Sequence, residues 1–201
     1  MRLSPDREIL HLIPQGFTVD KQTGVVNPVE MEGHHLQVDA HVVTASSTAL
    51  NNILKALSRA SVEADSMICG ILAAGEVVLD RNERDLGVVL IDIGGQTIDI
   101  AIYHRNHVRF ITELSLGGDN ITRDLATGMR TSVKDAQELK ERFGAAGPAL
   151  VSHNEEIRYP SLDGRSDRPT HRKQICEIIQ PRVEEMFELV RAELDRSNLR
   201  E

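Results

Sequence analysis

Residues 90–99 read Leu90-Ile91-Asp92-Ile93-Gly94-Gly95-Gln96-Thr97-Ile98-Asp99, and this stretch decides how the rest of the chain is interpreted. Aliphatic residues flank the Gly94-Gly95 pair on both sides, which is typical of two antiparallel strands joined by a tight turn. A two-residue turn of this kind needs the positive φ angles that glycine tolerates. The predicted pairing sets Ile93 opposite Gln96, Asp92 opposite Thr97, and Ile91 opposite Ile98.

Strand alternation then predicts one apolar and one polar face for this hairpin. Asp92, Thr97 and Asp99 fall on the polar face, beside a glycine turn with exposed amides. Such amides can approach phosphate oxygens closely, and a carboxylate can hold Mg²⁺ through its waters. A purely structural hairpin explains the glycine pair equally well. It explains Asp99 less well, because aspartate is disfavoured inside a β-branched strand.

The N-terminal region is predicted to form a small α/β unit. Strand-like runs cover residues 8–13, which Pro14 is expected to end, and residues 36–43, where apolar and polar residues alternate. Residues 46–60 are expected to form a helix, because Ser46 can cap it and the apolar residues fall on one face.

The remaining chain is predicted to continue as mixed strands and helices. A helix is expected over 71–79, followed by a solvated polar linker over 80–85. Strands are expected over 88–91 and 98–103, and a third strand follows a turn at 105–107. Three helices are then expected: one over 120–127, one from Thr131 or Ser132 to Phe143, and one over about 175–194. Gly144 is expected to stop the second of these three helices. Pro181 is expected to kink or restart the last one, because proline cannot donate the backbone hydrogen bond.

Composition excludes several classes of protein. The net charge is −8, without a block of like charges, which argues against nucleic acid as the main partner because phosphate binding needs a basic surface. No apolar run reaches the roughly 18 residues of a membrane-spanning helix. Cys69 and Cys176 lack metal-ligand or redox spacing, so reduced thiols in a cytosolic protein are expected.

A second glycine motif, Leu116-Gly117-Gly118-Asp119, introduces the helix over 120–127. Helix N-termini attract anions through free N–H groups and the helix dipole, although a capped loop–helix junction explains this motif at least as well. Lys140 and Glu141 lie on a charged helix, for which a solvated face is the simplest interpretation.

The order of these motifs resembles the FtsA family of bacterial cell-division proteins, within the actin/Hsp70 superfamily of ATPases. The Asp92 hairpin, the Gly117-Gly118 helix and the sequence Leu-Lys-Glu-Arg-Phe-Gly over 139–144 are similar to the second half of such an ATPase. The flanking sequence is similar to FtsA in particular, over residues 11–15, 24–29, 31–33, 36–44, 83–88 and 175–182.

The resemblance implies an α/β, actin-like (ribonuclease H-like) fold that is partial and carries an FtsA-type 1C subdomain. Residues 1–68 are implied as subdomain 1C, incomplete at its N-terminus. Residues 69–85 are implied as the connecting helix and linker of subdomain 1A. Residues 86–201 are implied as subdomains 2A and 2B, incomplete at the C-terminus. We expect the family's N-terminal phosphate motif, C-terminal adenosine motif and amphipathic membrane helix to lie outside this sequence.

The resemblance also implies a set of site residues and two cofactors, ATP and Mg²⁺. They are Gly94, Gly95, Gln96 and Thr97 around the phosphates, Asp92 near Mg²⁺ through water, Gly117 and Gly118 near the sugar, Lys140 and Glu141 on the adenosine side, and Arg165 and Arg182 on the surface that receives the FtsZ tail. Gln96 departs from the family, which usually has a small residue there. Its side chain is expected to crowd the phosphate or to replace a contact.

The implied function is that of an ATP-binding filament protein that links FtsZ to the cytoplasmic membrane at the division septum. Implied partners are the FtsZ C-terminal tail, further copies of the chain, and other division proteins through the 1C region. The membrane is implied only through the C-terminal helix, which makes the intact protein peripheral on the cytoplasmic face. No general base is identifiable. Half a nucleotide clamp is therefore expected to be a weak ATPase at most, because preorganisation from both sides supplies much of the affinity.

Two other interpretations stay open. One is a small-molecule kinase or a chaperone-type ATPase of the same superfamily, for which neither a catalytic acid nor a substrate domain can be placed. The other is a truncated form that binds partners without nucleotide, which Gln96 favours.

Overall fold

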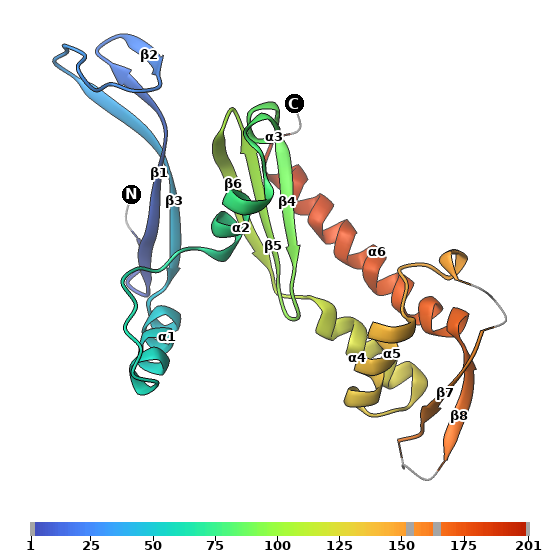
Figure 1. Ribbon diagram of the computed structural model, residues 1–201. Coiled ribbons are helices and arrows are strands. Elements are labelled where there is room, and N and C mark those ends of the chain that lie inside the picture. The colour runs from blue at the N-terminus through green and yellow to red at the C-terminus, as the bar shows by residue number, and fades with distance from the viewer. Residues whose placement is uncertain (1–2, 152–154, 163–165, 200–201) are drawn as a thin grey trace. The chain divides into compact units, whose positions relative to one another are not determined.

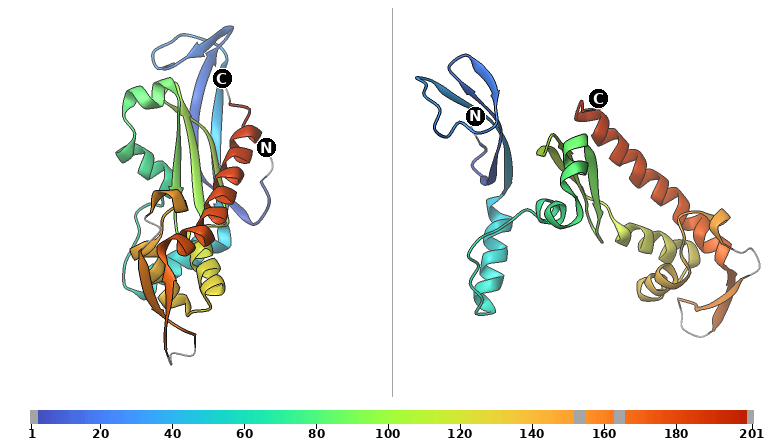
Figure 2. Two further views of the ribbon diagram at one scale, coloured as in Figure 1. Left: turned by 90° about the vertical axis from the view of Figure 1, so that its right-hand side faces the viewer. Right: turned by 45° about the horizontal axis from the view of Figure 1, so that its top comes forward.

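Mixed strands and helices make up the residues that the computed structural model describes, which are 3–151, 155–162 and 166–199 (Figures 1 and 2). The elements are β1 (Arg7–Val19), β2 (Gln22–Val25), β3 (Leu36–Ser46), α1 (Ser47–Arg59), α2 (Gly70–Val78), α3 (Arg81–Leu86), β4 (Val88–Ile93), β5 (Ile98–His104), β6 (His107–Leu114), α4 (Gly118–Met129), α5 (Val133–Phe143), η1 (Pro148–Leu150), β7 (Glu156–Pro160), β8 (Asp167–His171) and α6 (Arg172–Arg196). Unit 1 comprises the chain up to Leu90 together with Ile100–Ile111, and unit 2 comprises Ile91–Asp99 together with the chain from Thr112. The three segments predicted from the resemblance divide the chain differently and stay a prediction.

The strand β1 does not end at Pro14, as predicted, but continues to Val19. It lies in a sheet of order β2-β1-β3, where Pro14 pairs with Ala40 beside a register shift that reaches Gly16. The short strand β2 pairs only with the end of β1, from Phe17 onward. Proline is therefore tolerated, because it lies at a bulge where β1 has no second partner strand for its missing N–H.

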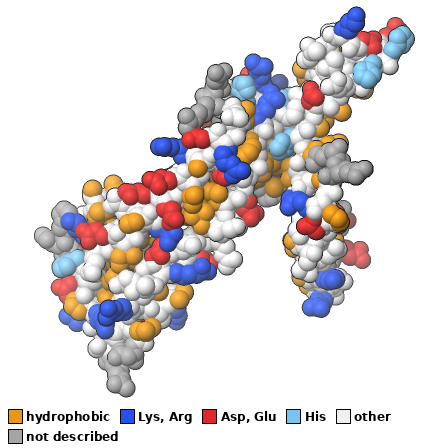
Figure 3. Space-filling view, turned by 180° about the vertical axis from the view of Figure 1, so that it is seen from behind, with side chains coloured by type: hydrophobic (Ala, Val, Ile, Leu, Met, Phe, Trp, Pro, Cys, Tyr) orange, Lys and Arg blue, Asp and Glu red, His pale blue; other side chains and the backbone are white. Residues whose placement is uncertain are grey.

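The apolar face of this sheet is partly open to solvent. The strand predicted over 36–43 is confirmed as part of β3, and Leu36 and Val38 pair with Val19 and Phe17 of β1. Leu36 is 60 % exposed and Val38 is 48 % exposed. The helix α1 begins where predicted, since the Ser46 hydroxyl accepts from the Ala49 N–H, yet it buries none of its residues. Apolar side chains therefore reach the surface among charged ones (Figure 3).

The predicted polar linker over 80–85 is instead the short helix α3. The Asp80 carboxylate accepts from the Glu83 N–H at 2.8 Å, and the Glu83 carboxylate accepts from the Asp80 N–H at 2.9 Å. This reciprocal capping box satisfies two of the N–H groups that a helix start leaves without partners. Two acidic residues three positions apart, Asp80 and Glu83, are a sequence signal for a helix start, and the prediction of a linker did not take it into account.

Unit 2 has its core between α4, α5, α6 and the β7–β8 hairpin. The buried cluster consists of Leu125, Met129, Ala136, Leu139, Ile157, Tyr159, Ile175 and Ile179. The Tyr159 hydroxyl donates to the Met129 carbonyl at 3.1 Å, which ties β7 to the end of α4.

The helix α6 runs without interruption through Pro181, so the prediction that it restarts there is wrong. Its buried residues lie on both sides of the proline, with Ile175 and Ile179 before it and Met186 and Val190 after it. Burial of side chains of this size stabilises the helix by about 1.5–3 kcal/mol each, which together exceeds the roughly 3 kcal/mol cost of an internal proline.

Candidate functional site

The turn between β4 and β5 lies one residue further along than predicted. The Gly94 N–H donates to the Thr97 carbonyl at 2.9 Å, which leaves Gly95 and Gln96 at the tip. Among the described glycines only Gly24 and Gly87 have positive φ, so the backbone expected for a Gly94-Gly95 turn is wrong as well. Left-handed backbone is therefore not why this turn contains two glycines.

The second glycine motif contacts this turn through main-chain atoms. The Gly118 N–H donates to the Gly94 carbonyl at 2.9 Å, and the Asp119 N–H donates to the Gly95 carbonyl at 2.7 Å. A Cβ atom on Gly117 would lie 2.5 Å from the Gly94 carbonyl oxygen and 2.6 Å from that of Gly95. Gly117 has φ −172°, which is extended backbone open to any residue. Glycine is thus needed at 117 for space alone.

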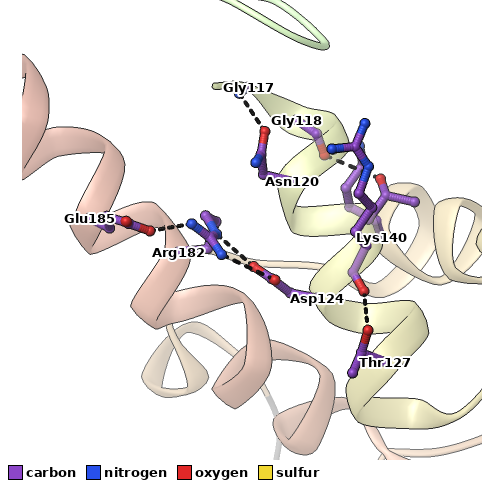
Figure 4. A network of polar contacts seen from close by, with 10 residues as sticks. Gly117, Gly118, Asn120, Asp124, Thr127, Lys140, Arg182 and Glu185 are labelled. Carbon is purple, nitrogen blue, oxygen red and sulfur yellow. Dashed lines mark hydrogen bonds and ion pairs between the residues drawn. The ribbon is translucent and has the colours of Figure 1, made fainter. Parts of the chain in front are cut away.

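These contacts change what the start of α4 can offer to an anion. The N–H groups of Gly118 and Asp119 are bonded to the hairpin, and the Asn120 N–H donates to the Gly117 carbonyl at 3.0 Å. The Asn120 side chain folds back and accepts from the Gly117 N–H at 3.0 Å (Figure 4). The expectation of free N–H groups at this helix N-terminus is therefore wrong for these four residues. Asn120 was not among the predicted site residues, although an amide three residues after a helix-capping position is a recognisable signal.

The hairpin tip, by contrast, presents free main-chain donors. Within the described part of the chain, no acceptor is bonded to the N–H groups of Gly95, Gln96 or Thr97. Gly95 and Gln96 are both exposed. Successive unpaired N–H groups in a turn form a concave site suited to an anion.

Acidic side chains gather beside this tip, as the strand alternation predicted. Asp99 on β5 is half-buried, and burial raises its pKa above the usual range, with further contributions from the negative charges of Glu113 and Asp92. No lysine or arginine among the described residues forms an ion pair with these three carboxylates. In the same part of the chain, no group of three or more His, Cys, Asp or Glu is arranged to hold a metal ion. Asp92 could therefore serve Mg²⁺ only together with water and a ligand's own oxygens.

Lys140 contacts the second glycine motif directly, whereas Glu141 is connected to it only through other side chains. The Lys140 ammonium donates to the Gly118 carbonyl at 3.0 Å (Figure 4). Glu141 is exposed and accepts from the Gln137 amide. The Gln137 amide oxygen in turn accepts from the buried Thr122 hydroxyl at 2.6 Å. The structure thus brings Lys140 to the turn and leaves Glu141 on the outer side of α5.

Of the two arginines predicted for partner binding, Arg165 lies outside the described residues. Arg182 is on α6, where its guanidinium bonds both oxygens of Asp124 on α4, at 2.6 and 3.2 Å, and also pairs with Glu185 (Figure 4). The hydrogen bond to Asp124 is the main reason why the pKa of Arg182 is raised above its usual value. A partner's carboxylate at Arg182 would therefore compete with two carboxylates of the chain itself.

Comparison with known proteins decides the family. The profile described as "Cell division protein FtsA" matches residues 89–200, and the profile "SHS2 domain inserted in FTSA" matches residues 1–44. The chain belongs to the FtsA family. FtsA of Pseudomonas aeruginosa is 39 % identical over 192 residues, covering 96 % of this chain and 46 % of that protein. FtsA of Escherichia coli K12 is 36 % identical over 194 residues, again covering 96 % of this chain and 46 % of the relative. The chain thus spans about half the length of these relatives.

A solved structure supports the same conclusion for the fold. The PilM-PilN type IV pilus biogenesis complex contains a chain that matches with a TM-score of 0.65, covering 99 % of this chain and 48 % of that one at 18 % identity. Identity this low bears on the fold alone. Together with the FtsA profiles, it confirms the predicted α/β, actin-like fold.

Substitution of Gly117 by alanine tests the contact between the two glycine motifs. We expect Gly117→Ala to lower the free energy of unfolding by about 2 kcal/mol, because its Cβ overlaps two carbonyl oxygens and forces the turns apart. Urea unfolding measures the change. Gly147→Ala is the matched control, since a Cβ there meets nothing within 4 Å. Equal stability of the two variants would show that the motifs are not in close contact.

Because the pKa of Asp99 is raised, replacing this residue should increase the free energy of unfolding by an amount that depends on pH. The fold disfavours the charged form, so the penalty is complete above the raised pKa and disappears as the pH falls toward the unfolded value of 3.8. We expect Asp99→Asn to raise the free energy of unfolding at pH 7 by about 0.5 kcal/mol, as for a cross-strand like-charge contact, and by progressively less in acid. Asp39→Asn, at an exposed position on β3, is the control. A gain that is independent of pH would contradict the charge explanation.

A double-mutant cycle tests the ion pair between α6 and α4. We expect Arg182→Ala and Asp124→Ala to show a coupling of about 1 kcal/mol in unfolding experiments, because the pair is bidentate and partly buried. The same cycle on Arg196 and Glu193 should give a coupling near zero, since the Arg196 side chain is 74 % exposed. Similar couplings for both pairs would refute this interpretation of Arg182.

Proposed function

We propose that the chain supplies one side of an ATP–Mg²⁺ site in an actin-like cell-division protein. The observation that carries the proposal is the pair of glycine turns held together by main-chain hydrogen bonds, with free N–H groups at the tip of the first. A rigid turn with unpaired amides binds phosphate oxygens without reorganising, which is the requirement for recognising a nucleotide through its backbone.

The residues divide the task by their chemistry. Gly95, Gln96 and Thr97 would donate main-chain N–H groups to phosphate oxygens, and Gly94 keeps the turn close to α4. Asp92 would hold Mg²⁺ through water, and the ion would offset the repulsion between phosphates and the nearby carboxylates. Gly117 and Gly118 would lie at the sugar, with Lys140 and Glu141 toward the adenosine. No residue is proposed as a general base, so any ATPase activity would be weak.

The cellular role follows from the family. The protein would polymerise, bind the C-terminal tail of FtsZ at a surface that includes Arg165 and Arg182, and contact other division proteins through residues 1–68. An acidic peptide beside arginines is chemically reasonable. The described residues contain no helix that is both long and apolar enough to cross a membrane. Membrane contact on the cytoplasmic face at the division site is part of the proposed role.

Two observations favour a second function, which is partner binding without nucleotide. The first N–H groups of α4 are already bonded to the hairpin, and the exposed Gln96 side chain is at the tip where the phosphates would bind. Both features reduce what the site can offer to a nucleotide.

Calorimetric titration of the 201-residue chain with Mg-ATP tests the proposal. We expect saturable binding that Asp92→Ala weakens about tenfold, which corresponds to the loss of one charge-assisted contact of about 1.4 kcal/mol. Asp39→Ala is the matched control and should leave the affinity unchanged. Absence of binding by a folded chain would rule out nucleotide binding by this chain on its own and leave partner binding as its function.

A further inference from the structure

Asp119 lies beside the candidate site, yet the proposed function gives it no task. It is the second residue of α4 and is half-buried. Within the described part of the chain, its carboxylate forms neither a hydrogen bond nor an ion pair. Partial burial removes some of the water around a charged group, and here no protein partner replaces that water, so the position of this carboxylate needs an explanation.

The Asp119 carboxylate lies against the tip of the β4–β5 turn. A Cβ atom on Gly95 would be 3.3 Å from its Oδ1 and 3.7 Å from its Oδ2, so both oxygens lie where a side chain at Gly95 would be. The backbone keeps Asp119 at this place, because its N–H donates to the Gly95 carbonyl at 2.7 Å. Gly95 also carries one of the free N–H groups of the tip, and Gln96 and Thr97 carry the others. A negative charge is therefore fixed next to donors that suit an anion.

This charge decides which kind of phosphate the tip can accept. Lys140 contacts the same glycine motif, but its ammonium donates to the Gly118 carbonyl at 3.0 Å, and no ion pair joins it to Asp119. A phosphate bound at the tip would lie within the Debye length of about 10 Å at 0.1 M salt, so Asp119 would repel it. A divalent cation between the two groups reverses the sign of this interaction, because the cation attracts both.

We infer that Asp119 makes the tip specific for a cation-bound phosphate over a free phosphate. This inference rests on the proposed phosphate site and adds a specificity-determining residue to it. In the described residues no three His, Cys, Asp or Glu side chains are grouped to hold a metal ion, so the cation would arrive with the phosphate. Asp119 also lies in the first turn of α4, where an acidic residue is favourable to the helix dipole whatever the ligand. The test therefore separates these two roles.

Titration of the whole chain with inorganic triphosphate, followed by amide NMR, tests the inference. This probe has neither sugar nor base, so its binding reports on the phosphate contact alone. We expect the amide signals of Gly95, Gln96 and Thr97 to shift saturably, and binding to be several-fold tighter with Mg²⁺ than in EDTA. In Asp119→Asn, which keeps the size of the side chain and removes its charge, Mg²⁺-free triphosphate should bind about fivefold more tightly than in the parent chain, as for one like charge a few ångströms away in water. The factor by which Mg²⁺ strengthens binding should fall accordingly.

Asp135→Asn is the matched control. It removes an acidic residue from the first turn of α5, where the side chain lines a different hollow against β7, and it should leave the Mg²⁺ factor unchanged. Asp119→Ser also removes the charge and should behave as Asp119→Asn, so the result does not depend on the folding of one variant.

Two outcomes would overturn the inference, and they differ in what they say of the proposed function. If Mg²⁺ strengthened triphosphate binding by the same factor in the parent chain and in the folded Asp119 variants, the role of Asp119 would be refuted and the phosphate site would stand. If the tip amides shifted in none of the folded chains, with or without Mg²⁺, the phosphate site itself would be refuted along with the role of Asp119.

Discussion

Two main-chain hydrogen bonds, from Gly118 to Gly94 and from Asp119 to Gly95, bring two turns distant in the sequence to within contact of their backbones. This approach requires that Gly117 carry no side chain, and it fixes where α4 begins relative to the β4–β5 turn. Through Lys140, which bonds Gly118, it also draws α5 to the same place. The candidate site is thus assembled by backbone atoms, and the side chains around it are positioned as a consequence.

The same hydrogen bonds decide which groups remain available for a ligand. Because the hairpin carbonyls take up the first N–H groups of α4, the helix start cannot present them to an anion, while Gly95, Gln96 and Thr97 at the tip keep theirs. The carboxylates of Asp92, Asp99 and Glu113 lie near one another without a basic partner among the described residues. Repulsion of this kind lowers the stability of the free protein and is reduced by a cation, which is why an acidic face beside free amides is consistent with a Mg²⁺-bound phosphate.

Packing overrides local preference at both prolines that the sequence suggested as breaks. At Pro14 the strand β2 does not extend far enough to accept a hydrogen bond from β1, so the missing N–H costs no pairing there. At Pro181 buried residues on either side keep α6 continuous. In each case the local cost is small compared with the burial or pairing of the flanking residues. The apolar face of the β2-β1-β3 sheet shows the opposite situation, because the alternation of β3 predicts a buried side but Leu36 and Val38 stay exposed.

The sequence by itself determined the α/β class, most helix limits and the family. The class and the helix limits follow from periodicity and from short-range capping, such as Ser46 before α1 and Ser132 before α5, which act over a few residues and can be read along the chain. The family follows instead from the resemblance of the chain's motifs to those of FtsA. It also placed Asp92 and Asp99 on one side of a hairpin, because alternation is a local property of strands. Only the tertiary structure decided that the turn tip is at Gly95-Gln96, that Gly117 is needed for space, that Arg182 is held by Asp124, and that the Tyr103 hydroxyl is buried against Gly75. Apart from the turn, whose register rests on the hydrogen bond between Gly94 and Thr97, each of these depends on a contact between residues far apart in the sequence, for which a linear pattern carries no signal.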